Sequence, residues 1–427
     1  MIGTWEDDVL VDPFCVFVQI GAQKESLRCW LRRAIFNTSP PRRHTRYQSF
    51  MSTFRIPFER VNWVTSLFLI GTFLLAITLV PWYVLSYEQT WFQWAMFAFM
   101  VPATAMSITL GYHRLFSHLS FKAKWPVKLF TLVFGACAFE NSCLDWSADH
   151  RTHHKHVDHD EDPYDISKGF FWAHMGWLMF KLRPEHPHTN VNDLLKEKLV
   201  MWQHRHVQKI AFLVGIVGPT ILGALHHHFF TDLPMWQGAL GGFLIAGVLR
   251  VVVVQHSTFF INSLCHTIGR RPYSTKHSAR DSVVMAFATF GEGYHNYHHE
   301  FQHDYRNGVK PWQWDPTKWT IWALSKLGLA SNLRRVPDSK ILLAEMGEAR
   351  LRAEEKLAAL NAVHPSMKDR AHVALHELCE NLAKNYAELE KAVAQRMEVS
   401  RQNLISWQNE TRELMRFVRS IRILSHA

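Results

Sequence analysis

Histidines gather in three short clusters of this 427-residue chain, which holds 27 histidines in all. The clusters read HRLFSH, HRTHH and HNYHH, and their histidines are His113 and His118, then His150, His153 and His154, then His295, His298 and His299. In the second and third clusters the spacing i, i+3, i+4 places three imidazoles on one face of a helix. A single helical turn can therefore offer several nitrogens to one or two metal ions.

The clusters indicate a metal site more strongly than an exposed histidine-rich loop. Two H-x-x-H-H patterns and one H-x4-H exceed chance even for this composition. Eight histidines also exceed the four ligands of a tetrahedral zinc site, whereas two metals with four or five imidazoles each fit the number. Imidazole accepts zinc, copper, iron or nickel, so ligand type leaves the metal open. A histidine-rich pair of metals at a membrane is best explained by redox chemistry, which favours iron that activates oxygen over the other metals.

The cysteines exclude other kinds of metal or disulfide protein. The chain has six cysteines, and none of them form a C-x-x-C pair or a dense pattern. This spacing excludes a disulfide scaffold, a cysteine zinc finger and an iron–sulfur protein. Metal chemistry in this chain must therefore depend on imidazole.

Four uncharged runs are long enough to hold the clusters at a membrane. They cover residues 62–87, 91–112, 210–231 and 233–249, and the last continues past Arg250 through VVVVQ. Each run can cross a hydrocarbon core of about 30 Å as a helix. Pro81 and Pro102 lie within or near these runs, which membrane helices tolerate. The sequence predicts an all-α integral membrane protein with four transmembrane helices in two hairpins and a cytosolic helical cap that holds a two-metal site.

The charges and the number of crossings predict the orientation. Residues 21–60 carry nine Lys or Arg and two Asp or Glu, whereas the link after the first run holds only Glu88. The amino terminus is therefore expected to be cytoplasmic, and four crossings return the carboxyl terminus to the same side. All three clusters fall on that side. The run His226–His228 falls on the opposite side and is excluded from a shared site.

Two apolar segments are too short to span. LFTLVFGACAF at residues 129–139 and FFWAHMGWLMF at residues 170–180 are predicted to be interfacial or buried helices. If the first were a true span, the clusters would be divided across the bilayer. No cleavable signal is evident in the first 50 residues, and Met51 is a candidate start.

From about Arg60 to Val336 the sequence resembles the membrane fatty acyl desaturases, especially the stearoyl-CoA type. The resemblance is carried by HRLFSH, DHRTHHK, DPYDISKGFFWAHMGW, EKLVMWQ, FINSLCHTIGRRPY and GEGYHNYHHEF. In that family nine histidines hold two irons (Fe2+/Fe3+), and they match the eight above and His266. Asn262 matches an asparagine that approaches one iron through water. Asp149, Asp158, Asp162 and Glu292 are the nearest acids that could orient the rings, or they are ordinary solvated charges or helix caps.

Other histidines near the clusters match no ligand of the family. We interpret His156, His159 and His303 as ordinary polar residues rather than as metal ligands. His174 is predicted to pack or to form hydrogen bonds. The remaining histidines are interpreted as surface positions.

The resemblance implies a kinked acyl tunnel, and Asn141, Trp146 and Thr258 match residues at its bend. This chain has Phe259 where the animal enzymes carry Trp, and Glu140 where they carry Gln. Ala103 and Ala105 lie two to three turns from His113 and could set the tunnel's depth, or they could simply let helices pack closely.

For the head group, Arg151, Lys181 and Arg183 match or nearly match basic residues that face coenzyme A phosphates. Leu182 replaces one lysine of the animal pattern, so an acyl-lipid or acyl-carrier substrate stays open beside acyl-CoA.

The resemblance implies an oxygen-dependent desaturase that introduces a cis double bond, at Δ9. Removing hydrogen from an unactivated methylene needs O2 and two electrons in a site that excludes water. No heme-binding H-P-G-G occurs, so the electrons are expected from a separate donor, a cytochrome b5-like protein or a ferredoxin with its reductase. A membrane two-iron hydroxylase of fatty chains or alkanes is the alternative, followed by a non-enzymatic metal-binding or transport protein. No nucleic-acid partner is expected.

The carboxyl-terminal part has no counterpart in this resemblance. We divide the chain into a basic segment at 1–60, a desaturase domain at 61–336 and a helical extension at 337–427. Leu375, Leu378, Leu382, Leu389 and Val393 fall near a heptad seam, which suggests a helical hairpin or a coiled coil, with a break at Pro365. Residues 407–424 form a basic amphipathic pattern, typical of a helix on an anionic membrane or of a packed helix with a solvated basic side.

Overall fold

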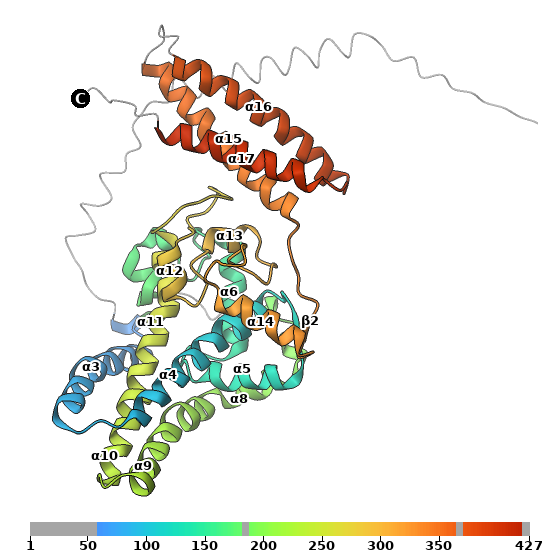
Figure 1. Ribbon diagram of the computed structural model, residues 1–427. Helices are drawn as coiled ribbons and strands as arrows, with labels where there is room; N and C mark the ends of the chain where they lie inside the picture. The colour runs from blue at the N-terminus through green and yellow to red at the C-terminus, as the bar shows by residue number, and fades with distance from the viewer. Residues whose placement is uncertain (1–57, 182–187, 364–369, 421–427) are drawn as a thin grey trace, which may run out of the picture. The chain divides into compact units, whose positions relative to one another are not determined.

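The computed structural model describes residues 58–181, 188–363 and 370–420 (Figure 1). From Arg60 onward the chain forms one compact unit. Nearly all of its regular structure is helical. Among the residues just given, two strands, β1 (Lys122–Ala123) and β2 (Ala330–Ser331), form one short antiparallel pair in which Lys122 faces Ser331.

Within the described residues, four helices are long and apolar enough to cross a membrane, as the sequence predicts. The first is α3 (Trp63–Ser86), and the second is α4 (Trp91–Met106), continued by a π-helical segment, Ser107–Ser117. The third joins α8 (Lys198–Phe212), a π-helical turn at Leu213–Val217 and α9 (Gly218–Phe230). The fourth joins α10 (Met235–Gly241), a π-helical segment at Gly242–Leu249, α11 (Arg250–Ser263) and a 3₁₀ turn at Leu264–His266.

The third and fourth helices are longer than the uncharged runs that predicted them. The third begins at Lys198 rather than at residue 210, and the fourth continues past Arg250 to His266. The reason is that absence of charge marks only the part of a helix that lies in hydrocarbon, whereas α8 continues with Lys198, Arg205 and Lys209. The extra turns of the fourth helix bring His266 to the histidine clusters.

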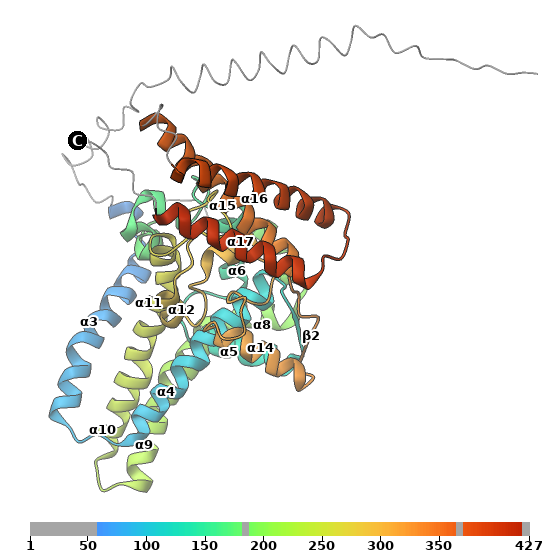
Figure 2. The same ribbon diagram turned by 45° about the horizontal axis from the view of Figure 1, so that its top comes forward.

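The four helices form two hairpins whose links lie at the same end. In Figures 1 and 2 the α9–α10 link lies at the bottom and the end of α3 at the lower left, whereas α6 lies toward the other end in both views, and so does α13 in Figure 1. The histidine-bearing helices are therefore gathered at one end of the bundle. His226 and His227 belong to α9 near the opposite end, as predicted.

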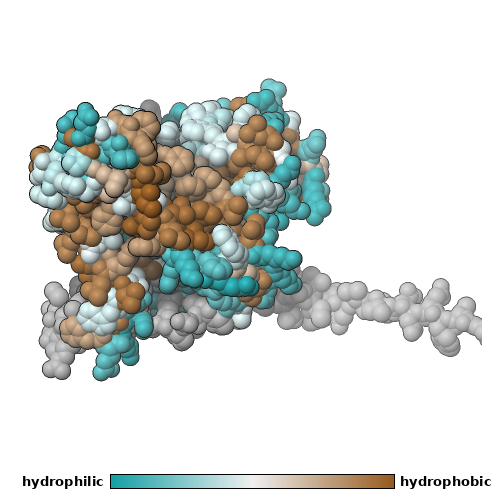
Figure 3. Space-filling model, turned by 90° about the horizontal axis from the view of Figure 1, so that it is seen from below, coloured by the Kyte–Doolittle hydropathy of each residue, from teal (hydrophilic) through white to brown (hydrophobic). Residues whose placement is uncertain are grey.

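The outer faces of these helices are hydrophobic. Val64, Leu85 and Phe230 are 82%, 86% and 77% exposed. Figure 3, viewed from the end where α9 and α10 meet, shows brown, hydrophobic residues over much of the surface. Large exposed apolar area on long apolar helices indicates contact with lipid, which is consistent with an integral membrane protein.

Short helices form the cap around the clusters. They are α5 (Trp125–Ala136), α6 (Cys143–His156), α7 (Trp177–Met179), α12 (Val283–Ala288), α13 (His295–Glu300) and α14 (Pro316–Lys326), with a π-helical turn at Trp172–Gly176 and 3₁₀ turns at Phe58–Arg60, Ile166–Lys168, His188–Asn190 and Leu194–Lys196. The two apolar segments predicted to be too short to span form α5 and the short helical pieces ending in α7. Leu132 and Leu144 are buried in the core that joins α5 and α6 to the second membrane helix.

The carboxyl-terminal extension is a three-helix bundle rather than a hairpin or a two-stranded coil. Its helices are α15 (Asp338–Val363), α16 (Arg370–Ala394) and α17 (Arg401–Ser420). Leu375, Leu382 and Leu389 are buried in its core, so the predicted seam on α16 is confirmed. Trp407 and Leu414 of α17 are buried there too. The apolar side of α17 therefore packs within the bundle, which supports the packed-helix interpretation.

Candidate metal centre

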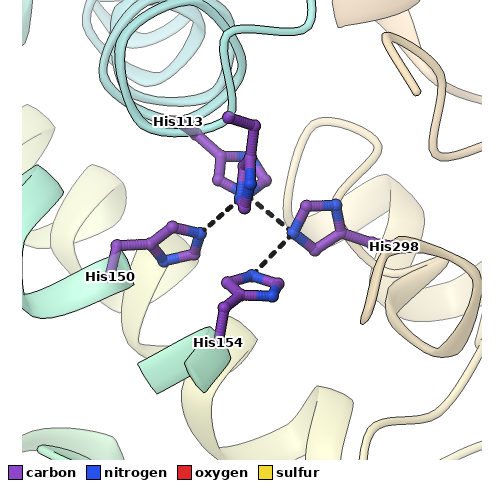
Figure 4. Close-up of side chains that lie close together, drawn as sticks. His113, His150, His154 and His298 are labelled. Atoms are coloured by element: carbon purple, nitrogen blue, oxygen red, sulfur yellow. Dashed lines mark hydrogen bonds between the residues drawn. The ribbon is translucent and has the colours of Figure 1, made fainter. Parts of the chain in front are cut away.

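Five histidine rings converge where the second membrane helix meets α6 and α13. They are His113, His118, His150, His154 and His298, and one ring nitrogen of each lies within 4.8 Å of those of the others. The Nε2 atoms of His113 and His298 are 3.0 Å apart, and so are those of His154 and His298. Those of His118 and His150 are 2.8 Å apart. Figure 4 shows four of the rings with nitrogens turned toward a shared centre.

A second group of four rings lies beside the first. Its members are His153, His266, His295 and His299. Nε2 of His295 is 3.2 Å from that of His266 and 3.1 Å from that of His299, and Nε2 of His153 is 3.3 Å from that of His299. The structure thus brings together all nine of the histidines that the resemblance implies, including His266, which lies in no sequence cluster.

The spacing of these nitrogens fits metal ligation. Two imidazoles bound to one metal at about 2.1 Å, at right angles to each other, place their nitrogens about 3 Å apart. Six pairs of Nε2 atoms within the two groups are 2.8 to 3.3 Å apart, and all the facing nitrogens of each group lie within 4.8 Å of one another. Nδ1 of His113 and Nδ1 of His153 each face a carboxylate, so Nε2 of each neutral ring presents a lone pair rather than a proton to its group. The residues therefore fit two metal ions better than a metal-free hydrogen-bonded cluster.

Burial keeps these rings in the protonation state that binds metal. It lowers the pKa of His118, His150 and His154 well below the usual value, and the neighbouring histidines lower it further. The same causes act on the pKa of His295, His298 and His299. Neutral imidazole is the metal ligand, so the site is preorganised for a cation without competition from protons at neutral pH.

Two acids orient rings from behind, as predicted. Glu292 Oε2 lies 3.0 Å from Nδ1 of His113, and Asp162 Oδ2 lies 2.9 Å from Nδ1 of His153. Burial alone would raise the pKa of Glu292, but the positive charge of Arg114 and the contact with His113 lower it to about 2. A carboxylate that accepts the Nδ1 proton leaves Nε2 free to bind a metal.

Asp158 acts through a serine that sequence reasoning missed. Its carboxylate accepts hydrogen bonds from the backbone N–H and the hydroxyl of Ser278, at 2.6 and 2.5 Å, and this hydroxyl is 2.7 Å from Nδ1 of His266. Tyr164, also missed, has its hydroxyl 3.3 Å from Nδ1 of His150. Neither residue lies in a histidine cluster, so only the tertiary structure reveals these contacts. Asp149 instead lines the cavity described below.

The other nearby histidines belong to neither group. His156 faces Glu161 at 3.9 Å, and His303 contacts the backbone oxygen of His118 at 3.0 Å. His174 contacts Ser263 at 2.9 Å and His256 at 3.0 Å, so its predicted hydrogen-bonding role is confirmed. His277, which the sequence did not single out, packs its ring 5.1 Å from that of His299.

A cavity of about 460 Å³ reaches the first group of histidines, because His113 and His150 are among its lining residues. All four of the residues predicted to lie near the reacting chain or the metal also line it: Asn141, Trp146, Thr258 and Asn262. Most of its exposed surface is apolar, through side chains such as Phe68 and Leu69. The arrangement suits a long apolar chain whose middle lies beside the metal ligands.

Two of the three positions that depart from the animal pattern belong to this cavity, and the third, Leu182, lies outside the described residues. Glu140 and Phe259 both line it, and burial raises the pKa of Glu140 to about 8. Ala103 and Ala105 do not line it, whereas Ile108 does. Both alanines are buried, which favours their role in helix packing over a role in setting the cavity's depth.

The three basic residues predicted for the head group have different surroundings. Arg151 holds both carboxylate oxygens of Asp193, at 2.7 and 2.9 Å, and donates to the backbone oxygens of Phe116, Ser117 and Asn190. Lys181 is exposed, and its backbone N–H donates to the oxygen of Arg60 at 2.6 Å. Arg183 lies outside the described residues.

Comparison with known families agrees with this site. A model of the family described as fatty acid desaturase matches residues 89–326, more than half of the chain. The chain belongs to the fatty acid desaturase family. The matched region includes all nine grouped histidines and most of the cavity, so the metal centre and the cavity lie in the part that desaturases share.

Named desaturases are similar over much of this region. "Probable acyl-CoA desaturase" of Schizosaccharomyces pombe is 40% identical over 285 residues, covering 66% of this chain and 57% of that protein. "Acyl-CoA desaturase 1" of Saccharomyces cerevisiae is 36% identical over 307 residues, covering 71% and 58%. "Stearoyl-CoA desaturase" of Homo sapiens is 35% identical over 273 residues, covering 63% and 72%. The matches thus span less than two thirds of the two yeast desaturases.

Proposed function

We propose that this protein is an oxygen-dependent acyl-CoA desaturase that introduces a cis double bond, at Δ9, into a saturated fatty acyl chain. The observation that carries the proposal is the apolar cavity whose wall includes His113 and His150 of the first histidine group. A saturated chain in this cavity would have its methylenes beside the metal ligands. The names of the similar yeast and human proteins support coenzyme A as the carrier.

The nine histidines would hold two iron ions, five in the first group and four in the second. When bound, iron supplies the oxidising chemistry, in which O2, two electrons and two protons remove two hydrogens from the chain and leave two waters. The protein's own part is to keep the rings neutral and aimed inward. Glu292 and Asp162 would accept the Nδ1 protons of His113 and His153, which fixes the tautomer of each ring.

The cavity residues would position the chain and keep water from it. Trp146 stacks on the face of the His150 ring at 4.7 Å between centroids, and both residues line the cavity, so Trp146 would help to hold this ring beside the chain. Asn141 and Thr258 would shape the bend, and Asn262 would approach one iron through water. Excluding bulk water protects an oxidant from wasteful reduction.

For the head group, Lys181 and Arg183 are the proposed phosphate contacts. Lys181 is exposed and lies three residues after Leu178, which lines the cavity with Trp177, and this nearness along the chain supports a phosphate contact at the cavity's edge. Arg151 could contact a phosphate only by giving up Asp193, because its donors already bond to acceptors in the chain. Its proposed role in substrate binding is therefore the weakest of the three.

We further propose that the metal centre and both termini face the cytoplasm, with electrons from a separate donor such as a cytochrome b5-like protein or a ferredoxin. The excess of Lys and Arg in residues 21–60 supports this orientation. Helices α6 and α13, which carry histidines of both groups, lie away from the α9–α10 link (Figure 1).

Expression in a host that lacks unsaturated fatty acids tests the function. The expected result is growth without added unsaturated fatty acid and a cis double bond at Δ9 by mass spectrometry. His298→Ala should abolish both without preventing accumulation of folded protein. Hydroxylated chains would favour the hydroxylase alternative, and unchanged lipids with well-folded protein would contradict the proposal.

The metal proposal has its own measurement. Protein purified after growth in iron-replete medium should contain close to two irons per chain. Stoichiometric zinc under the same conditions, with mismetallation controlled by adding iron to the metal-free protein, would contradict it.

A further inference from the structure

A second cavity, also of about 460 Å³, lies where the carboxyl-terminal bundle meets the segment after α11. Five arginines line it: Arg270, Arg271 and Arg280 from that segment, Arg352 from α15 and Arg419 from α17. Its other lining residues are Thr275, Leu351 and the acids Glu348 and Glu355. It shares no lining residue with the cavity that reaches the histidines.

The acids neutralise only part of this positive charge. Glu348 Oε1 accepts hydrogen bonds from the backbone N–H and the hydroxyl of Thr275, at 2.7 and 3.2 Å, and its Oε2 lies 3.8 Å from Nη2 of Arg352. With two carboxylates against five guanidiniums, the walls keep an excess of positive charge.

Two of these guanidinium groups, those of Arg271 and Arg280, make only long hydrogen bonds inside the protein. Arg280 donates from Nη1 to the oxygen of Gly269 at 3.4 Å, and its buried Nε has no hydrogen-bond partner. Arg271 donates from Nη1 to the backbone oxygens of Thr275 and His277, at 3.3 and 3.4 Å. A buried donor without a partner, such as Nε of Arg280, is costly unless another acceptor satisfies it.

The cations repel one another across the cavity. Burial lowers the pKa of Arg352, and the positive charges of Arg271 and Arg419 lower it further, although Glu348 acts in the opposite direction. An anion between these side chains would relieve the repulsion. Guanidinium groups bind phosphate oxygens through paired N–H bonds, so phosphate is the anion that this lining suits best.

We propose that this cavity binds a small molecule that carries two or more phosphate groups. One phosphate would leave part of the excess charge unbalanced, whereas two or more match it. The volume is within the range of sites for nucleotide-sized ligands. The site is separate from the proposed desaturase reaction and does not depend on it.

The ligand would connect the carboxyl-terminal bundle to the segment after α11, which also contacts the second histidine group. The segment that supplies Arg270, Arg271 and Arg280 also contains Ser278, which contacts His266. Its backbone is held by Asn296 of α13, whose side chain accepts from the N–H of Tyr273 at 2.9 Å and donates to the oxygen of Ala279 at 3.0 Å. A ligand that bridges Arg271 and Arg352 should therefore slow amide hydrogen exchange between residues 271 and 281.

The test is a binding titration on the full-length protein in detergent. The probes are ADP, as a free phosphate compound, and short-chain phosphatidylinositol bisphosphate, as a lipid head group. The double variant Arg352→Gln/Arg419→Gln should bind at least about tenfold more weakly than wild type, because charge-assisted hydrogen bonds are lost. Arg416→Gln, an exposed change on the same helix outside the cavity, should bind like wild type.

If only ADP binds, the ligand is a soluble phosphate compound. If only the lipid binds, the ligand is a lipid head group. Either result supports the proposed phosphate site. If neither probe binds, the proposal is overturned. It is also overturned if the double variant and Arg416→Gln bind a probe with equal affinity. Because Arg352 also donates to the backbone oxygen of Arg271, the double variant could loosen the bundle. Arg280→Gln, on the opposite wall, is therefore tested alongside and must also weaken binding.

Discussion

Nδ1 of His113 lies 3.0 Å from Oε2 of Glu292, while the other oxygen of the same carboxylate accepts from Arg114 at 2.9 Å. All three side chains are almost completely buried. Arg114 also contacts Asp315 at 3.0 Å, so one guanidinium joins two carboxylates from separate parts of the chain. This connection fixes a metal-facing ring of the second membrane helix to the segment just before α13.

Replacing Glu292 with Gln should weaken metal binding. Gln can present an amide N–H to Nδ1 and thereby favour the wrong tautomer of His113, and it removes the charge that faces Arg114. Loss of such a partner typically weakens metal binding about 10- to 100-fold. The measurement is the iron content of purified protein against increasing chelator concentration.

A matched control separates this effect from loss of charge in general. Glu197 pairs with Lys128 at 2.6 Å on the partly exposed outside of the cap. Glu197→Gln should change iron retention by less than about twofold, because exposed ion pairs contribute little. Equal iron retention in Glu292→Gln and wild type would contradict the assigned role of Glu292.

Glu140 should make substrate binding depend on pH. Burial raises its pKa to about 8, so the carboxyl in the cavity is neutral at pH 7 and charged at pH 9. A charge beside an apolar chain is unfavourable, and KM should rise as the pH passes 8 in wild type. In Glu140→Gln, KM should stay flat over this range. A parallel rise in both proteins would assign the pH effect to another group.

The same shift has a consequence for stability. Between the ordinary pKa of 4.5 and about 8, the folded protein keeps a proton on Glu140 that the unfolded chain releases. The free energy of unfolding should therefore fall as the pH rises through this window, and this part of the fall should be absent in Glu140→Gln. Thermal unfolding of both proteins at several pH values measures the difference.

Much of the fold could be predicted from the sequence because its signals are local. Uncharged runs locate membrane helices, and the leucine spacing on α16 identifies the face that the bundle buries. The links between helices also predict which histidines share an end. These inferences need only the period of a helix and the thickness of a membrane.

The division of the site into two groups is not a local property. The spacing of His150, His153 and His154 predicts one shared helical face, yet His153 belongs to the second group and the other two to the first. Rings one residue apart diverge by about 100° around a helix, so each joins whichever partners approach from other elements. Ser278 and Tyr164 were missed for the same reason, because their contacts join residues brought together only by folding.

Arg250 is a buried cation within a membrane helix, and we expect it to stabilise the fold. It donates to the backbone oxygens of Ala246 at 3.2 Å, of Gly215 at 2.5 Å, and of Cys137. Arg250→Ala would leave these oxygens unpaired and a cavity behind. We expect a loss of about 2–4 kcal/mol in the free energy of unfolding.

Thermal unfolding in detergent, followed by size-exclusion chromatography, measures this loss. Arg250→Lys should fall between wild type and Arg250→Ala, because an ammonium keeps the charge but reaches fewer acceptors. Arg205→Ala, an exposed cation on α8, should unfold like wild type. If Arg250→Ala is as stable as wild type, the free-energy cost of burying the charge equals the stabilisation from its hydrogen bonds, and our expectation is contradicted.

The α9–α10 hairpin should tolerate no side chain at Gly223. A Cβ at this position would overlap the backbone oxygen of Gly238, and one at Gly238 would overlap the oxygen of Gly223. The two helices thus pack backbone to backbone, as small residues allow in membranes. Gly223→Ala should force them apart and destabilise the protein by about 1–3 kcal/mol.

Gly71→Ala on α3 is the control, because a Cβ there meets no atom within 4 Å. It should unfold at or slightly above the wild-type temperature, since alanine favours a helix over glycine. Equal unfolding temperatures for the two variants would contradict close packing in this hairpin.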